Sequence, residues 1–151
     1  VPPDHHEAIV DSLWEAHHRV GLWTVAIPGA VETVRGLRRR GYRVGVVSNA
    51  EGRVETDLAS AGFDGLLETV VDSHHVGIEK PDPAIFAIAL ERLGAQAASS
   101  IFVGDVPAVD LDGARAAGIF PLLLDRHDLY PGVDAPRLRR IHDLRDWLDE
   151  A

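Results

Sequence analysis

Apolar positions along the chain recur with two periods, one typical of helices and one of short buried strands. Ile9, Leu13, Ala16 and Val20 recur three to four residues apart, which predicts an amphipathic helix over residues 4–20. From residue 30 onward the pattern becomes a repeated unit of helix, glycine and short apolar strand. The predicted helices cover residues 30–40, 51–61, 83–93 and 107–117. The predicted strands cover residues 42–47, 67–71, 100–103 and 120–124.

The composition of the predicted strands indicates their position in the fold. They are short and rich in Val, Leu and Ile, as strands covered on both faces are. Their alternation with helices predicts an α/β three-layer sandwich with a Rossmann-like, mostly parallel sheet. A final helix over residues 138–150 follows an irregular segment, 125–136. With 151 residues, the chain is long enough for one compact domain with a hydrophobic core.

The charge balance narrows the classes of partner. The chain has 15 basic and 24 acidic residues, a formal net charge of −9, so we expect no nucleic-acid partner. No apolar run approaches the roughly 20 residues that span a bilayer. No leader pattern and no cysteine occur, so we expect a cytoplasmic protein without a membrane partner. The chain begins with Val, and we expect it to be part of a longer translation product.

Polar residues follow three of the predicted strands, at the ends where ligands collect in parallel α/β sheets. Ser48 and Asn49 come directly after the first strand and before a helix. Lys80, the single lysine beside 14 arginines, lies in the loop after the second strand. Asp105 ends the third strand, and Asp110 follows five residues later. A hydroxyl, backbone N–H groups and an ammonium suit a phosphate, and carboxylates suit a hard cation such as Mg²⁺.

Each of these signals also has a plain structural interpretation when taken alone. Ser48 and Asn49 are common capping residues at helix starts. Lys80 could be an exposed loop lysine or pair with its neighbour Glu79. Two carboxylates near the start of a helix are stabilised by the helix dipole without any metal. The specificity of the signal therefore lies in the combination and in its order along the chain.

Taken in that order, the three segments resemble the second, third and fourth motifs of the haloacid dehalogenase-like hydrolase superfamily. The matching residues are Ser48-Asn49, Lys80-Pro81-Asp82-Pro83 and Gly104-Asp105 with Asp110. The resemblance extends over about residues 26–124. It implies hydrolysis of a small phosphomonoester, with Mg²⁺ as cofactor, through an aspartyl-phosphate intermediate.

The resemblance also implies a role for each residue. Ser48 would bind the phosphoryl oxygens, and Asn49 would shape the same phosphate-binding loop. Lys80 would neutralise charge on the phosphoryl group and the nucleophile, which makes Lys80 and Asp105 the expected catalytic residues of this chain. Asp105 would bind Mg²⁺ directly, and Asp110 would hold a metal-bound water or orient its neighbours.

The first motif of this superfamily, a strand that ends in Asp-x-Asp and carries the nucleophile, has no counterpart in the sequence. The similar run from Asp110 to Gly113 follows no apolar strand and lies in the fourth-motif segment. The resemblance places the missing strand in the middle of the sheet, between the strands that end at Ser48 and Asp105. Strands lie about 4.8 Å apart, so its absence leaves a gap of about 10 Å. Since unpaired buried edges are costly, we expect another chain, a separate peptide or direct pairing of the flanking strands to fill the gap.

We therefore interpret the chain as a fragment of a Mg²⁺-dependent phosphatase that is inactive by itself. Residues 1–24 are expected to be the C-terminal remnant of a helical cap, and residues 25–151 the α/β core without its first strand. Two alternatives remain open. One is a non-catalytic phosphate-binding or interaction module, and the other is a haloacid dehalogenase, which uses no metal. Much of the specificity of capped members comes from the cap, so the sequence does not identify the substrate.

Overall fold

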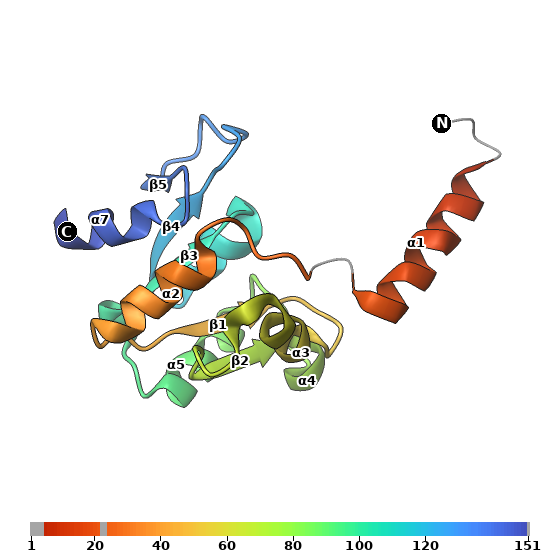
Figure 1. The fold of residues 1–151 in the computed structure, drawn as a ribbon. Coiled ribbons are helices and arrows are strands. Elements are labelled where there is room, and N and C mark those ends of the chain that lie inside the picture. Colours follow the sequence, from red (N-terminus) through yellow and green to blue (C-terminus); the bar gives the residue numbers. More distant parts are fainter. Residues whose placement is uncertain (1–4, 22–23, 151) are drawn as a thin grey trace.

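The computed structural model describes residues 5–21 and 24–150, and Figure 1 shows their arrangement. The helices are α1 (His6–Val20), α2 (Ala30–Arg39), α3 (Val54–Leu58), α4 (Ser73–Val76), α5 (Pro83–Leu93), α6 (Asp112–Ala116) and α7 (Asp143–Glu150). The strands are β1 (Gly45–Ser48), β2 (Thr69–Asp72), β3 (Ile101–Gly104), β4 (Phe120–Leu124) and β5 (Arg137–Leu138). Shorter helical turns lie at Ala59–Phe63, Ala97–Ser99 and Pro107–Leu111.

The strands form two parallel sheets, which confirms the α/β class and the parallel pairing. β1 pairs with β2, with Gly45 opposite Thr69. In the second sheet β4 lies between β3 and β5, and Ile101 of β3 is opposite Phe120 of β4. In the view of Figure 1, β1 and β2 lie below α2, whereas β4 and β5 lie above it.

A cavity of about 530 Å³ lies between β1 and β3, where the missing central strand was expected. β1 and β3 line it on two sides, and residues of α2, α5 and α7 line the rest. β1 and β3 do not pair with one another in the described part of the chain, so direct pairing of the flanking strands, one of the three expected ways to fill the gap, does not occur there. Filling of the gap by another chain or a separate peptide stays a prediction.

Two hydrophobic clusters pack on opposite faces of the strands and hold both sheets together. On one face α5 contributes Ile85 and Phe86, and the partly buried Val47 of β1 and Phe102 of β3 pack against this cluster. On the other face α2 and α7 contribute Leu37 and Leu144, and Val44 and Val103 pack against them. Each cluster therefore takes side chains from both sides of the cavity. The covering helices bridge two sheets that are not paired with each other.

The observed elements differ from the predicted ones mainly where helices begin. α5 and β4 have the predicted bounds. The helix predicted from residue 51 begins only at Val54, because the preceding loop is held in another conformation by Asp72 and Ser73 of the neighbouring strand end. The helix predicted from residue 138 begins at Asp143, and the unpredicted strand β5 takes the start of that segment. In both segments tertiary contacts outweigh the local helical pattern.

The first helix, α1, lies apart from the strands in Figure 1. Its predicted apolar face is not covered by the described residues, since Ile9, Leu13 and Trp14 are 42%, 51% and 50% exposed. The predicted boundary after residue 24 adjoins residues 22–23, which lie outside the described residues, so the division into 1–24 and 25–151 stays a prediction. None of the helices in the described ranges has both the length and the apolar character required to cross a membrane.

Candidate functional site

Asn49 joins the loop after β1 to the loop that carries Lys80. Its side-chain Nδ2 donates a hydrogen bond to the Lys80 carbonyl oxygen at 3.0 Å, and its Oδ1 accepts one from the Lys80 backbone N–H at 2.8 Å. Both ends of the amide are therefore used to fix the position of the second loop. Ser48, directly before Asn49, is the last residue of β1 and is half-buried.

Lys80 reaches from this loop to the segment that follows β3. Its Nζ donates to Asp110 Oδ1 at 2.7 Å and lies 5.5 Å from the centre of the Phe102 ring. The two partners are largely buried, with 13% of the Lys80 side chain and 5% of the Asp110 side chain exposed. An ammonium has three N–H donors. Within the described residues, the Lys80 ammonium donates to Asp110. Two of its three N–H groups therefore remain available to a ligand.

Asp110 also fixes the backbone at the end of β3. Its Oδ2 accepts hydrogen bonds from the backbone N–H groups of Asp105 at 3.0 Å and Val106 at 2.9 Å. Gly104 makes room for this carboxylate, since a Cβ there would lie 2.3 Å from the Asp110 Cβ. Both carboxylate oxygens of Asp110 thus have partners inside the protein. These hydrogen bonds fix the Lys80 ammonium and the backbone after β3, and the roles expected for Asp110 in catalysis stay predictions.

Three sequence segments meet at one edge of the two sheets through these contacts. A continuous chain of hydrogen bonds runs from Asn49 through Lys80 and Asp110 to the backbone of Asp105. These hydrogen bonds connect the carboxyl end of β1 to that of β3 through Lys80, which lies in the loop between α4 and α5. The Asp105 carboxylate is exposed and makes no hydrogen bond or ion pair with the described residues. The chemical roles of these residues stay predictions.

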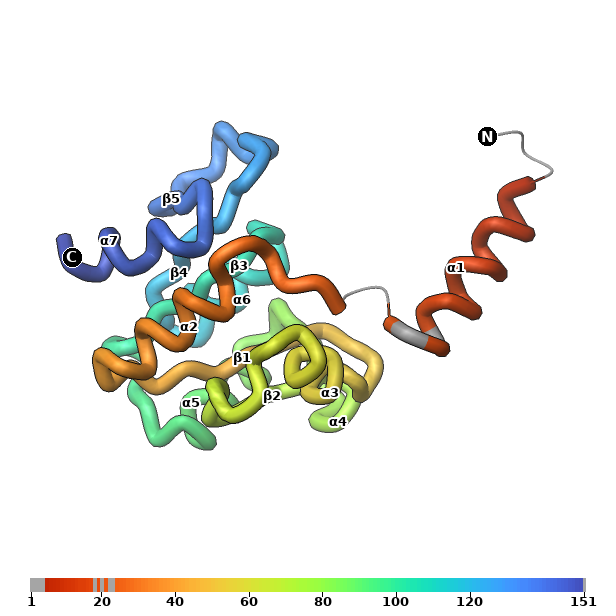
Figure 2. The backbone as a smooth tube through the Cα atoms, in the orientation of Figure 1, coloured from red at the N-terminus to blue at the C-terminus, as the bar shows by residue number. Residues whose placement is uncertain are grey.

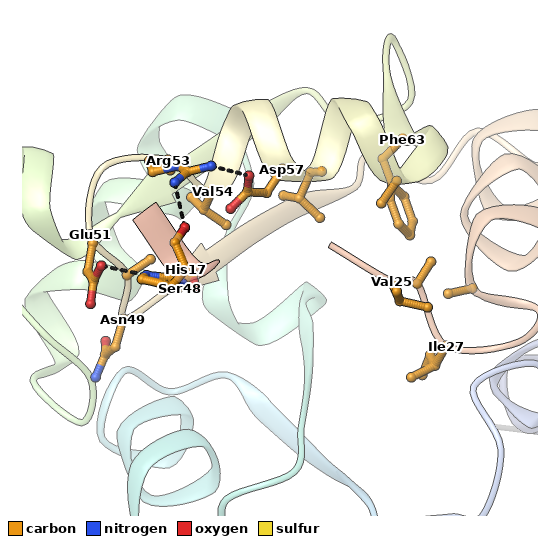
Figure 3. A pocket seen from close by; sticks show the side chains of 15 residues that line it. His17, Val25, Ile27, Ser48, Asn49, Glu51, Arg53, Val54, Asp57 and Phe63 are labelled. Carbon is orange, nitrogen blue, oxygen red and sulfur yellow. Dashed lines mark hydrogen bonds and ion pairs between the residues drawn. The ribbon is translucent and has the colours of Figure 1, made fainter. Parts of the chain in front are cut away.

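A pocket of about 530 Å³ opens beside Ser48, and Figure 3 shows its lining. On its polar side, His17 Nε2 lies 2.8 Å from Glu51 Oε2, and Arg53 Nη1 donates to the His17 carbonyl oxygen at 3.0 Å. The C-terminal end of α1 therefore forms part of the pocket wall. The apolar side includes Val25, Ile27 and Phe63.

Two residues that the sequence pattern did not single out hold the loop after β1. Asp72 and Ser73, at the end of β2, are 4% and 3% exposed. The Asp72 carboxylate accepts from the backbone N–H groups of Gly52 at 2.9 Å and His74 at 3.0 Å. The Ser73 hydroxyl accepts from the Ala50 N–H at 3.1 Å. Asp-Ser after an apolar strand is a helix-capping pattern, so a local signal was present. The contact with a loop about twenty residues earlier could not be predicted from the local sequence.

The type of ligand atom at this edge, a carboxylate oxygen, suits a hard cation. Asp105 supplies an exposed carboxylate, the ligand type that Mg²⁺ prefers. Asp110 does not add a second open carboxylate, because its oxygens accept from Lys80 and two backbone N–H groups. Within residues 5–21 and 24–150, no group of three or more His, Cys, Asp or Glu side chains is placed to hold a metal. The described residues would therefore provide one direct ligand to the ion.

Most of the chain is similar to known sequences of one family. The family model of haloacid dehalogenase-like hydrolases matches residues 3–118. The mouse haloacid dehalogenase-like hydrolase domain-containing protein 3 is 36% identical over 116 residues, which cover 77% of this chain and 46% of that protein. Phosphoserine phosphatase from Thermus thermophilus is 30% identical over 151 residues, covering 99% of this chain and 59% of the enzyme. The chain thus spans about half the length of these curated relatives.

Comparison with solved structures gives the same fold. A phosphatase of this superfamily from Thermococcus onnurineus superposes with a TM-score of 0.77 at 27% identity, over 82% of this chain and 58% of that one. A 2-haloacid dehalogenase from Pseudomonas syringae superposes with a TM-score of 0.76 at 25% identity, over 99% of this chain and 64% of that one. Because the family match extends over most of its length, the chain belongs to the haloacid dehalogenase-like hydrolases.

Proposed function

We propose that the chain supplies the phosphate-binding and metal-binding residues of a Mg²⁺-dependent phosphatase that acts on a small phosphomonoester. The observation that carries the proposal is the chain of hydrogen bonds from Asn49 through Lys80 and Asp110 to the backbone of Asp105. It gathers an ammonium and an exposed carboxylate at the strand ends, next to the hydroxyl of Ser48. Relatives that are phosphatases, such as the one from Thermus thermophilus, support this choice within the family.

Phosphoryl transfer depends mainly on positioning and on stabilising negative charge that is spread over the phosphoryl oxygens. Lys80 has two N–H donors beyond the one given to Asp110, and these would bind two phosphoryl oxygens. The Ser48 hydroxyl would donate to a third oxygen. Asn49 contributes by fixing the loop of Lys80 rather than by contacting the ligand.

Asp105 would hold the Mg²⁺ ion, which would supply further neutralisation of the phosphoryl charge. Asp110 would act through its neighbours, because it fixes both the Lys80 ammonium and the backbone N–H of Asp105. A shift of Asp110 would therefore displace the phosphate-binding cation and the metal ligand together.

The nucleophile is expected to be an aspartate at the carboxyl end of a further strand between β1 and β3. Its carboxylate would attack phosphorus to form an acyl phosphate, while a second acid protonates the departing alcohol. Water would then attack the acyl phosphate, releasing inorganic phosphate and restoring the carboxylate. The 151 residues alone are therefore expected to be inactive. We use "complete enzyme" for a protein that contains them together with such a strand.

The pocket beside Ser48 supports a small phosphorylated metabolite as substrate. Its volume of about 530 Å³ suits a compact organic group, and its wall combines Arg53 with apolar side chains. The relatives named phosphoserine phosphatase and, in Methanopyrus kandleri, glyceraldehyde 3-phosphate phosphatase carry the names of substrates of this size. The second of these is 32% identical over 111 residues, covering 71% of this chain.

A second candidate function is dehalogenation of a small haloacid, which the likeness to the Pseudomonas syringae dehalogenase favours. Such enzymes use no metal, so the two functions differ in their response to chelation. A third outcome is a module that binds phosphate without turnover.

The deciding experiment measures hydrolysis of p-nitrophenyl phosphate by the complete enzyme with Mg²⁺ and with EDTA. We expect activity only with Mg²⁺, and Asp105→Asn should lower kcat/KM by about 100-fold or more because it weakens the metal site. Asp112→Asn is the matched control, since Asp112 is exposed and pairs only with Arg115 at 3.1 Å among the described residues. Release of halide from 2-chloropropionate in EDTA would support the dehalogenase instead. Phosphate binding without turnover of either compound would support the binding module.

A further inference from the structure

The loop between β1 and α3 brings a carboxylate, that of Glu51, to the pocket beside Ser48. Glu51 follows Ser48 by three residues, and both line the pocket of about 530 Å³. Figure 2 shows the backbone of this loop on the side of the core that faces α1. In Figure 3, Glu51 lies on the polar side of the pocket, opposite Val25 and Phe63. The loop to which we assign phosphate binding thus also carries a negative charge in the pocket wall.

The backbone on both sides of Glu51 is held by the end of β2. The Ala50 N–H donates to the Ser73 hydroxyl at 3.1 Å, and the Gly52 N–H donates to Asp72 Oδ2 at 2.9 Å. Gly52 has a φ of 87°, a left-handed conformation that favours glycine, so the chain turns directly after Glu51. The starting point of the Glu51 side chain is therefore fixed, as recognition of a small ligand requires.

One oxygen of the Glu51 carboxylate is open to a ligand. Its Oε2 lies 2.8 Å from His17 Nε2. Its Oε1 has no hydrogen-bond or ion-pair partner in residues 5–21 and 24–150. The Glu51 side chain is 58% exposed, whereas that of His17 is 11% exposed. Because an ionised carboxylate has two acceptor oxygens, Glu51 can keep its contact with His17 and accept a hydrogen bond from a ligand.

The cation of the pocket wall, Arg53, is directed to partners inside the protein. Its Nη1 donates to the His17 carbonyl oxygen at 3.0 Å, and its Nη2 lies 3.6 Å from Asp57 Oδ1. The Asp57 carboxylate therefore offsets the Arg53 charge. With histidine counted as neutral, the charged residues in the lining are Glu51, Arg53 and Asp57, two carboxylates and one guanidinium, which leaves one negative charge.

We propose that Glu51 is a specificity-determining residue that binds an ammonium group on the alcohol part of the substrate. This role rests on the proposed phosphatase function and narrows its substrates to phosphorylated amino alcohols. The phosphate would bind to Lys80 and Ser48, and the substrate ammonium would donate to Glu51 Oε1. A hydrogen bond between an ammonium and a carboxylate is stronger than one between neutral groups.

The same wall disfavours an anionic alcohol part. A substrate carboxylate in this place would face Glu51 with a charge of the same sign, which repels it. Arg53 does not compensate, because its terminal nitrogens are directed to His17 and Asp57. A hydroxyl can donate to Glu51 but brings no charge attraction. Preference should therefore fall from an ammonium through a hydroxyl to a carboxylate.

The test compares three phosphomonoesters of similar size that differ in the charge of their terminal group. They are 2-aminoethyl phosphate, 2-hydroxyethyl phosphate and phosphoglycolate, assayed at neutral pH with Mg²⁺ and the complete enzyme. We expect kcat/KM for 2-aminoethyl phosphate to exceed that for 2-hydroxyethyl phosphate by about fivefold, with phosphoglycolate the poorest of the three. If the complete enzyme does not prefer 2-aminoethyl phosphate, the proposal is overturned.

Two substitutions of Glu51 test whether this residue is the source of the preference. Glu51→Gln removes the charge and keeps the shape, so the ratio of kcat/KM for the aminoethyl ester to that for the hydroxyethyl ester should fall about fivefold. Glu51→Lys should reverse the order in favour of phosphoglycolate, which loss of a merely structural contact would not do. Glu55→Gln is the matched control, since Glu55 is exposed on α3 outside the pocket lining, and it should keep the ratio. An unchanged ratio in Glu51→Gln would overturn the role of Glu51.

Hydrolysis of p-nitrophenyl phosphate separates this proposal from the proposed function, because its alcohol part carries no ammonium. If the complete enzyme hydrolyses p-nitrophenyl phosphate without a preference among the three esters, the phosphatase function stands and the role of Glu51 falls. If none of the four compounds is hydrolysed, both fall. Circular dichroism establishes that the variants are folded, and the preference of the unaltered enzyme decides the question if they are not.

Discussion

Two buried aspartates, Asp110 and Asp125, lie in different parts of the molecule, and in both the cost of burying a charged carboxylate is offset by hydrogen bonds and a cation. Asp110 is 4% exposed and Asp125 is 2% exposed. Each accepts hydrogen bonds from two backbone N–H groups, of Asp105 and Val106 in the first case and of Leu129 and Tyr130 in the second. Each is also paired with a cation. A buried carboxylate is tolerated only with such partners.

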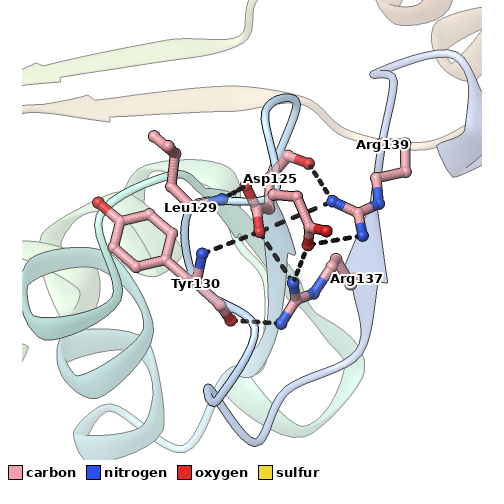
Figure 4. Close-up of polar contacts among 6 residues, drawn as sticks. Asp125, Leu129, Tyr130, Arg137 and Arg139 are labelled. Carbon is pink, nitrogen blue, oxygen red and sulfur yellow. Dashed lines mark hydrogen bonds and ion pairs between the residues drawn. The ribbon is translucent and has the colours of Figure 1, made fainter.

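The two sites differ in the cation. Asp125 pairs with Arg137 at 2.8 Å and lies 3.8 Å from Arg139, as Figure 4 shows. Both guanidinium groups also bind Asp128. Arg137 further donates to the Tyr130 carbonyl at 2.6 Å, so both of its terminal nitrogens have partners within the loop. These contacts close the segment between β4 and β5.

At the other site the cation is the only lysine of the chain, and Asp110 uses one of its three donors. Two arginines that bind two carboxylates and two main-chain carbonyls of one loop stabilise that loop. A lysine held by one carboxylate still has donors for a ligand. The comparison therefore supports the proposal that the Lys80 site binds a ligand and that the Asp125 site stabilises a loop, although the two aspartates are equally buried.

The largest effect is expected from removing the cation beside each aspartate, one at a time. Lys80→Met in the complete enzyme should lower kcat/KM for p-nitrophenyl phosphate by about 10²–10³-fold, because it removes a positive charge from the developing phosphoryl charge. Arg137→Met should leave kcat/KM within about twofold and lower the urea midpoint of unfolding instead. If Arg137→Met lowers kcat/KM as much as Lys80→Met does, the division between the two sites is wrong.

A second test acts on the space beside Asp110. Gly104→Ala would bring a Cβ to 2.3 Å from the Asp110 Cβ and 2.6 Å from its Oδ2, so Asp110 or the strand end must move. We expect the free energy of unfolding to fall by about 1–3 kcal/mol, as in other overpacked sites. The control is Gly132→Ala, where a Cβ would meet no heavy atom within 4 Å. Urea unfolding measures both, and equal stabilities of the two variants would contradict the close packing at Gly104.

The Asp125 site should respond to the geometry of its cation. Arg137→Lys keeps the charge but loses the fork that binds Asp125, Asp128 and the Tyr130 carbonyl together. We expect a fall in the urea midpoint that is smaller than for Gly104→Ala. Arg126→Lys is the control, since Arg126 is exposed and makes no hydrogen bond or ion pair with the described residues of this cluster, and it should leave the midpoint unchanged.

Acid should destabilise the Asp125 site in a defined pH range. Burial alone would raise the pKa of Asp125, but the N–H groups of Leu129 and Tyr130 and the two arginines outweigh it and hold the pKa below its ordinary value of 3.8. The ionised carboxylate therefore contributes stability above pH 3.8, and this contribution is lost as the pH falls from there through the lowered pKa.

Replacing this carboxylate should flatten the response to acid. In Asp125→Asn, the free energy of unfolding should depend less steeply on pH below 3.8 than in the unaltered chain, as measured by urea unfolding at a series of pH values. Asp134→Asn, at an exposed carboxylate of the same loop, should keep the original slope. A steep slope retained in Asp125→Asn would locate the acid sensitivity elsewhere.

The smallest effect is expected at the contact between α1 and the pocket. Glu51 is largely exposed, with 58% of its side chain accessible, and its partner His17 lies 2.8 Å away. Such pairs contribute about 0.2–1 kcal/mol, so Glu51→Gln should change the free energy of unfolding by less than about 1 kcal/mol. Glu55→Gln, at an exposed position in α3, is the control for loss of one surface charge. A much larger loss would show that α1 depends on this contact.

The sequence by itself determined the fold class and singled out the candidate functional segments. Short apolar strands alternating with glycine-terminated helices are dictated by local periodicity, so α5 and β4 were predicted with the observed bounds. Lys80 was recognisable because a lone lysine among 14 arginines follows a strand, and Asp105 because it ends one. These signals lie within a few residues of each other and need no knowledge of distant contacts.

Only the tertiary structure decided which groups these residues meet. Asp110 accepts from Lys80 thirty residues away, and Asp72 holds a loop twenty residues earlier, because strand pairing brings separate segments to one edge. The cluster around Asp125 has no local signature for the same reason, since its arginines act across a loop. The gap between β1 and β3 was expected from the family resemblance, and the tertiary structure shows what holds it, because the covering helices pack against both sheets.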